Sequence, residues 1–132
     1  MEKGTQQDEK TSKLYGVRTI SNGEISKDSY DIVIESGRLK SITKSIVDTG
    51  LYICPAYVDI HTNGAMGVVF SSVDQEKVDK VSQYHFSHGI THVCPTFVAT
   101  PIEVLEKQID SLYSFYPSGA LFLGAHIEGP YI

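Results

Sequence analysis

Short alternating apolar runs dominate the first part of the sequence. Three β-like runs, LYGVRTI, YDIVIE and LKSI, are separated by Asn22-Gly23 and by Ser36-Gly37. Turn-forming residues between such runs are typical of antiparallel strands joined by tight turns. We therefore predict a small antiparallel meander, preceded by a disordered tail over the polar and charged residues 1–13.

After Pro55 the apolar runs become longer and alternate with helical spacing. The strand candidates are AYVDIH, THVCPTFV and ALFLGAHIEGP, and the spacing between them predicts helices over Gln75–His88 and from Thr100 to before Pro117. Near-continuous apolar strands that alternate with helices favour a parallel α/β sheet covered on both faces.

The predicted helices carry recognisable start and stop signals. Ser72 and Gln75 have the spacing of a capping box, and Gly89 stands where the first helix should stop. Thr100 is predicted as the N-cap of the second helix, with Pro101 at its first position.

Composition narrows the class of protein. The 132 residues are 41% hydrophobic and 20% charged, which is typical of a globular domain with one core at most. The formal net charge is -5 and the lysines are scattered, so we predict no nucleic-acid partner. No segment approaches the roughly 18 apolar residues that a membrane helix needs, and no secretory signal stands at the N-terminus. We expect a cytosolic protein whose partner is a small molecule.

The stretch AYVDIHTNGAMG has two readings. Asn63-Gly64 between apolar runs is a typical hairpin turn. The alternative is a functional loop, because α/β folds place their chemistry at the carboxyl ends of the strands. The predicted strand and helix order favours the functional loop.

Period-two alternation assigns the side chains of this strand to two faces. It places Tyr57, Asp59 and His61 on one polar face, and Val58 and Ile60 on the other, packed against helices.

A second polar pair stands at the end of the third strand candidate. His126 and Glu128 share a face directly before a Gly-Pro break, and a carboxylate there is costly to bury unless it is paired or bound to a metal. The plainer reading is a solvated loop glutamate. We interpret His85, His88 and His92 as structural, because two end a helix and the third opens a strand.

These segments carry a family resemblance. PAYVDIHTNG, HGITHVCPT and GAHIEGPYI resemble the N-terminal part of the N-acetylglucosamine-6-phosphate deacetylases of the amidohydrolase superfamily, from about Leu14 to Ile132. The resemblance implies a metal-dependent (β/α)₈ TIM barrel with a small β-sandwich domain assembled from both ends of the chain. It also implies hydrolysis of N-acetylglucosamine 6-phosphate to glucosamine 6-phosphate and acetate.

The resemblance also fixes the expected domains. Residues 14–54 would form the β-sandwich portion, and residues 55–132 the first three strands and two helices of the barrel. Because a complete barrel takes about 250 residues, the expected barrel is incomplete.

The resemblance also implies site residues. Glu128 is expected to bind a divalent metal such as zinc, and His61 is either a further ligand or a hydrogen-bonding group. Asn63 and Asp59 are expected to line the site, and the general-base aspartate is expected beyond Ile132.

Three functions stay open at this stage. The first is a truncated deacetylase that is inactive alone, with a homodimer left open for the full-length enzyme. The second is another cyclic-amide amidohydrolase, which the H-x-N and HIEGP segments disfavour. The third is a non-catalytic fragment that binds a full-length subunit or a sugar phosphate.

Overall fold

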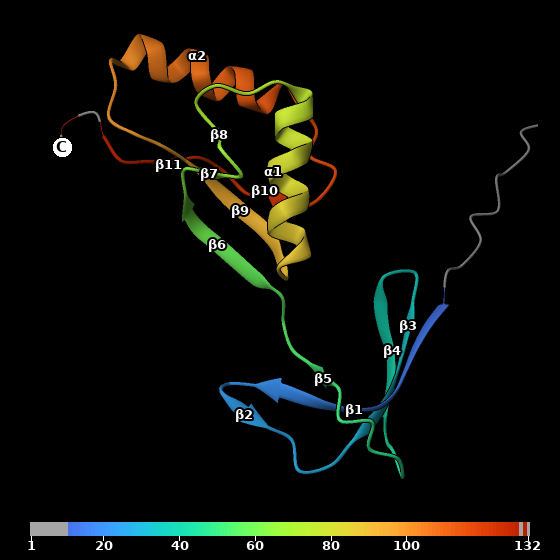
Figure 1. The fold of residues 1–132 in the computed structure, drawn as a ribbon. Helices are drawn as coiled ribbons and strands as arrows, with labels where there is room; N and C mark the ends of the chain where they lie inside the picture. Colours follow the sequence, from blue (N-terminus) through green and yellow to red (C-terminus); the bar gives the residue numbers. More distant parts are fainter. Residues whose placement is uncertain (1–10, 130, 132) are drawn as a thin grey trace, which may run out of the picture. The chain divides into compact units, whose positions relative to one another are not determined.

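The chain folds into two compact units, Met1–Pro55 and Ala56–Ile132. The structure is a computed structural model that describes residues 11–129 and residue 131 (Figure 1). Each unit has a sheet of its own, so each is described by itself.

The first unit is a small, mainly antiparallel sheet. Its strands are β1 (Thr11–Ser21), β2 (Glu24–Ile25), β3 (Tyr30–Glu35), β4 (Arg38–Lys44) and β5 (Tyr52–Ile53). The order is β2-β1-β3-β4, and β5 adds a parallel pairing to β1. The predicted antiparallel meander is confirmed. The predicted tail is wrong over residues 11–13, since Thr11 already pairs with Glu35, and residues 1–10 lie outside the described residues.

Both predicted turns of the meander occur where the sequence places them. Asn22 and Gly23 have φ values of 53° and 78°, and Ser36 and Gly37 have φ values of 50° and 73°. Two successive positive φ values match the right-handed twist of a two-residue hairpin, which asparagine and glycine adopt at low cost.

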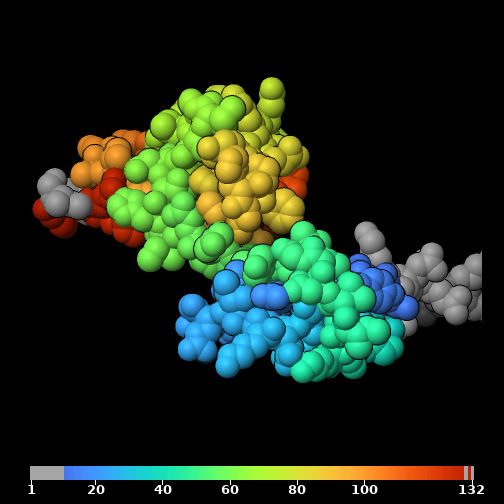
Figure 2. Space-filling view, turned by 60° about the horizontal axis from the view of Figure 1, so that its bottom comes forward, coloured from blue at the N-terminus to red at the C-terminus, as the bar shows by residue number. Residues whose placement is uncertain are grey.

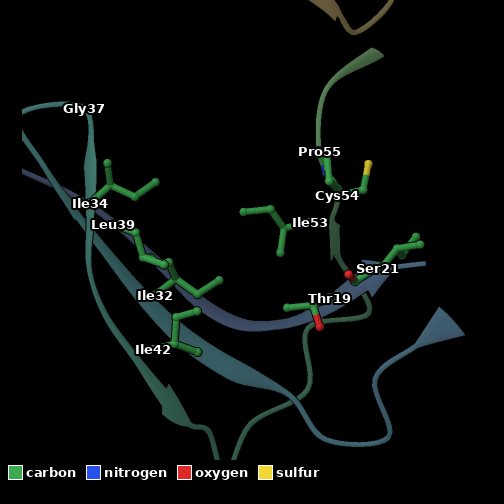
Figure 3. Close-up of a pocket in the computed structure, with 11 residues that line it drawn as sticks. Thr19, Ser21, Ile32, Ile34, Gly37, Leu39, Ile42, Ile53, Cys54 and Pro55 are labelled. Atoms are coloured by element: carbon green, nitrogen blue, oxygen red, sulfur yellow. The ribbon is translucent and has the colours of Figure 1, made fainter. Parts of the chain in front are cut away.

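An apolar hollow of about 570 Å³ lies on this sheet (Figure 3). Aliphatic side chains supply most of its lining: Ile20, Ile32, Ile34, Leu39, Ile42 and Ile53. Leu39 and Ile42 remain exposed, so the described residues leave this apolar side of the sheet partly uncovered.

The second unit contains a parallel sheet and two helices. Its elements are β6 (Tyr57–Thr62), β7 (Gly64–Ala65), β8 (Val68–Val69), α1 (Gln75–Ser87), β9 (Ile90–Phe97), α2 (Ile102–Tyr113), β10 (Leu121–Phe122) and β11 (His126–Ile127). β9 pairs in parallel with β6, β10 and β11, which confirms the predicted parallel order. The third predicted strand is interrupted into β10 and β11. Figure 2 shows the green and yellow segments of this unit, from β6 to α1, packed side by side.

The helix ends differ in detail from the predicted caps. The N-cap of α1 is Asp74, whose carboxylate accepts a hydrogen bond from the Lys77 amide at 2.9 Å, so the predicted capping box is wrong. A carboxylate already stands next to the first turn and is the better acceptor for its free amides. α2 begins at Ile102 with Pro101 as its N-cap and without a side-chain cap, so the predicted cap at Thr100 is wrong as well.

Both helices cover the same face of the parallel sheet. One buried cluster joins residues of α1, β9 and α2 with the β8 region and Ala120: Val68, Phe70, Val78, Val81, Val93, Phe97, Leu105, Leu112 and Ala120. No described helix is long and apolar enough to cross a membrane.

The register of the strands defines the two faces. Asp59 and Phe122 are both in register with Val93, which is fully buried under the helices. The neighbouring row, Val58 and Leu121 in register with His92, belongs to the opposite face, and Val58 and Leu121 are 49% and 52% exposed. We call this opposite side the open face. The prediction that helices cover both faces is therefore wrong.

Residues 1–132 expressed alone should aggregate, because the open face and the β6 edge expose apolar side chains and unpaired backbone groups. Val58→Lys with Leu121→Lys should raise the soluble fraction after expression, since both positions are exposed. Val93→Lys, the matched control from the helix-covered row, should lower it, because an unpaired buried charge costs about 4 kcal/mol. A monomeric parent chain that melts cooperatively at micromolar concentration would contradict this expectation.

The second unit should lose stability as the pH falls from 7.5 to 5.5. His85 lies buried on α1, and burial lowers the pKa of its imidazole. The charge of Asp59 raises this pKa, but its effect is smaller than that of burial. The unfolded chain therefore takes up a proton below about pH 6.5 while the folded state does not, which favours unfolding. Hydrogen exchange of β9 amides measures the effect. His85→Leu should weaken the pH dependence, and an unchanged pH dependence in this variant would contradict the expectation.

Candidate functional site

A β-bulge near the end of β6 sets the direction of His61. Asp59 is in register with Val93 and Thr62 with Pro95, so three steps along β6 match two steps along β9. Val93 and Pro95 are both buried on the helix-covered face, so Asp59 and Thr62 belong to that face. Ile60 and His61 between them both fall on the open face. The predicted uninterrupted alternation is wrong at this point.

The structure also corrects the predicted environment of the apolar residues of β6. Val58 and Ile60 were expected to pack against helices, but they are 49% and 68% exposed. Their exposure follows from the one-sided helix packing, because both helices of this unit cover the other face of the sheet.

His61 meets Glu128 across the carboxyl ends of β6 and β11. The His61 Nε2 atom lies 2.7 Å from Oε1 of Glu128, and the Asn63 amide donates to Oε2 at 3.4 Å. The His61 and His126 rings contact one another, with their centroids 4.4 Å apart. The four side chains form what we call the His61–Glu128 cluster: His61, Asn63, His126 and Glu128.

The cluster favours an ionised Glu128. The hydrogen bond from His61 lowers the pKa of the Glu128 carboxyl, and the Asn63 hydrogen bond and the charges of His61 and His126 act in the same direction. The side chain is partly exposed, with 28% of its surface accessible. Glu128 therefore carries a negative charge at neutral pH that can attract a cation.

The backbone around Glu128 is fixed by β9. The Glu128 amide donates to the Phe97 carbonyl at 3.0 Å, which extends the pairing of β11 past its last residue. A Cβ at position 129 would lie 2.6 Å from Cα of Ala99, closer than packed atoms approach. Gly129 is therefore needed for this close approach, which explains the glycine after Glu128.

The alternative reading of Asn63-Gly64 was a hairpin turn, and a hairpin forms three residues further along the chain. β7 and β8 pair around Met66 and Gly67, whose φ values are 55° and 76°. Asn63 is not among the residues with positive φ, and its side chain instead reaches Glu128. The loop after β6 thus combines a site residue with a nearby turn.

The structure brings together three of the sequence-predicted site residues and adds one. His61, Asn63 and Glu128 meet in the cluster, whereas Asp59 belongs to the opposite face. His126 was placed on the same strand face as Glu128 by their two-residue spacing, but no role at the site was predicted for it.

The cluster holds donor types that zinc accepts, a carboxylate oxygen and imidazole nitrogens. Within residues 11–129 and residue 131, no group of three histidine, cysteine, aspartate or glutamate side chains is arranged to hold a metal ion. Glu128 and His61 therefore account for only part of the ligand set of a zinc ion.

Comparison with known proteins gives a consistent set of relatives. The chain is 39% identical over 88 residues to N-acetylglucosamine-6-phosphate deacetylase from Bos taurus, and equally so to that from Homo sapiens. Each match covers 63% of this chain and 22% of the relative. No family model matches the chain.

The solved structures agree with the sequence relatives. The crystal structure of N-acetylglucosamine-6-phosphate deacetylase from Thermotoga maritima is similar with a TM-score of 0.72 and 26% identity, and the match covers 92% of this chain and 33% of that protein. These relatives and this structural neighbour are N-acetylglucosamine-6-phosphate deacetylases, and the chain spans about 22% of the length of the curated relatives from Bos taurus and Homo sapiens.

Proposed function

We propose that this chain supplies the N-terminal, metal-binding part of a deacetylase that acts on N-acetylglucosamine 6-phosphate. The observation that carries the proposal is the meeting of His61 and Glu128 at 2.7 Å, at the carboxyl ends of the two strands that flank the end of β9, in a unit similar to such deacetylases. The proposed reaction adds water across the acetamide and yields glucosamine 6-phosphate and acetate.

We also propose that the second unit is the first part of a (β/α)₈ barrel. One-sided helix packing supports this, because the helices of a barrel all lie outside its strands, whereas an open doubly wound sheet has helices on both faces. The open face would then be the barrel interior, and the carboxyl ends of β6 and β11 would belong to the active-site rim.

Glu128 and His61 would hold a divalent metal ion such as zinc, with Asn63 orienting the Glu128 carboxylate. Such an ion polarises a carbonyl and lowers the pKa of a bound water to near 7. In this chain Glu128 would supply the negative charge that attracts the ion, and Asn63 would keep the Glu128 carboxylate oriented toward it. The general-base aspartate and further ligands are expected outside residues 1–132. The cytosolic location and the homodimer stay predictions.

A second candidate is a non-catalytic chain that binds a larger subunit. The exposed apolar row of Val58 and Leu121 favours it, since such a surface is stabilised when another polypeptide covers it. The two candidates differ in whether residues 1–132 are ever joined to later barrel strands.

Residues 1–132 alone should not deacetylate. The cluster offers a carboxylate that is engaged as a proposed ligand, and no other carboxylate of the described residues belongs to the cluster to transfer the proton. Acetate release from N-acetylglucosamine 6-phosphate, measured with purified, zinc-supplemented protein, should equal that of buffer. Release above the buffer rate would contradict this expectation.

Glu128→Gln should remove the metal from a protein in which later strands of a structurally similar deacetylase complete the barrel. Glutamine keeps the size of the side chain but removes the charge, so metal content and turnover should fall together, turnover by roughly 100-fold. Metal analysis and acetate release measure the two quantities.

The matched variant for this test is His61→Gln, which keeps a polar group at the neighbouring position. We expect a milder loss, because His61 is the secondary ligand in our proposal. Retained metal and near-normal turnover in the Glu128→Gln protein, with both lost in His61→Gln, would show that β6 rather than β11 provides the principal ligand.

A further inference from the structure

The bulge in β6 raises a hydrogen-bonding problem. A bulge leaves a residue without its partner in the strand ladder, and an unsatisfied backbone amide is costly. Here Ile60 and His61 both fall on the open face between Asp59 and Thr62. Something other than β9 has to accept the His61 amide.

The acceptor is the side chain of Asp59. Its Oδ1 atom accepts a hydrogen bond from the His61 amide at 3.0 Å. The carboxylate therefore satisfies the amide of the residue that the bulge turns to the open face. This local side-chain contact competes with regular strand pairing, as aspartate side chains do in turns.

We propose that Asp59 is a positioning residue that holds the β6 bulge and thereby presents His61 to Glu128. Under regular alternation His61 would share a face with Asp59, on the helix-covered side of the sheet and away from His126 and Glu128. Asp59 acts through the His61 backbone. The consequence for a metal centre rests on the proposed function, whereas the positioning itself does not.

The competing explanation is that Asp59 serves as a counter-charge for His85. The Asp59 charge does act on His85, but the buried His85 Nε2 atom has no hydrogen-bond partner. A direct hydrogen bond from that atom to Asp59 is thus absent, while the bond to the His61 amide is present. The two roles separate by substitution, since asparagine keeps the acceptor oxygen and removes the charge.

The test uses the full 132-residue chain carrying a soluble tag and labelled only at histidine. Two signals report on His61: the nuclear Overhauser effect between the His61 and His126 rings, and the exchange rate of the His61 amide. Asp59→Asn should keep both. Asp59→Ala should lose the inter-ring signal and speed amide exchange about tenfold, which is the usual size of one lost hydrogen bond.

Two further variants serve as controls for this experiment. Asp59→Val places an apolar side chain beside Val93 and should behave like Asp59→Ala even if the alanine protein folds poorly. Asp48→Ala removes the same kind of contact elsewhere, the 2.9 Å hydrogen bond from the Gly50 amide to the Asp48 carboxylate, and should leave both His61 signals unchanged.

Either of two outcomes overturns the proposal. Retained inter-ring signal and amide protection in Asp59→Ala or Asp59→Val would show that the bulge holds without the carboxylate. Loss of both signals in Asp59→Asn would show that charge rather than hydrogen bonding matters. Neither measurement needs metal or turnover, so a barrel-completed protein that fails to deacetylate would refute the proposed function and leave this inference standing.

Discussion

One-sided packing of the helices is the constraint on which the second unit depends. Val93 and Phe97 of β9 are buried against residues of α1 and α2 in a single cluster. Residues in register with Val93 therefore face the core, and the residues that precede them along each strand face the open side. The packing of the core therefore determines which side chains of the sheet face the open side and are available for chemistry.

The His61–Glu128 cluster lies on the side that this core leaves uncovered. Strand alternation alone would send His61 to the core side with Asp59, and the bulge reverses that assignment. The extra residue breaks the strand ladder, and the Asp59 carboxylate offsets the loss by accepting the His61 amide. A local irregularity in the pairing of β6 with β9 thus places His61 beside Glu128.

The sequence predicted those features that depend on local signals. Asn22-Gly23 and Ser36-Gly37 form the turns, Gly89 follows α1, and the strands that pair with β9 are parallel to it. It failed where a tertiary contact decides. The bulge depends on the register against β9, and helix coverage depends on the crossover geometry of the whole sheet. Asp74 rather than Ser72 caps α1, because the helix begins at Gln75 and the Asp74 carboxylate accepts the Lys77 amide.

The pairing of His61 with Glu128 also bears on how a cation would enter. Here the His61 Nε2 atom and the Glu128 carboxylate share a hydrogen bond, so each occupies the position through which the other would bind a metal. A histidine ligand must be neutral, and its ring nitrogen must offer a free lone pair. A cation bound at Nε2 or at this carboxylate oxygen therefore has to replace the hydrogen bond between them. Without a metal, the same contact holds the two side chains together at the ends of their strands.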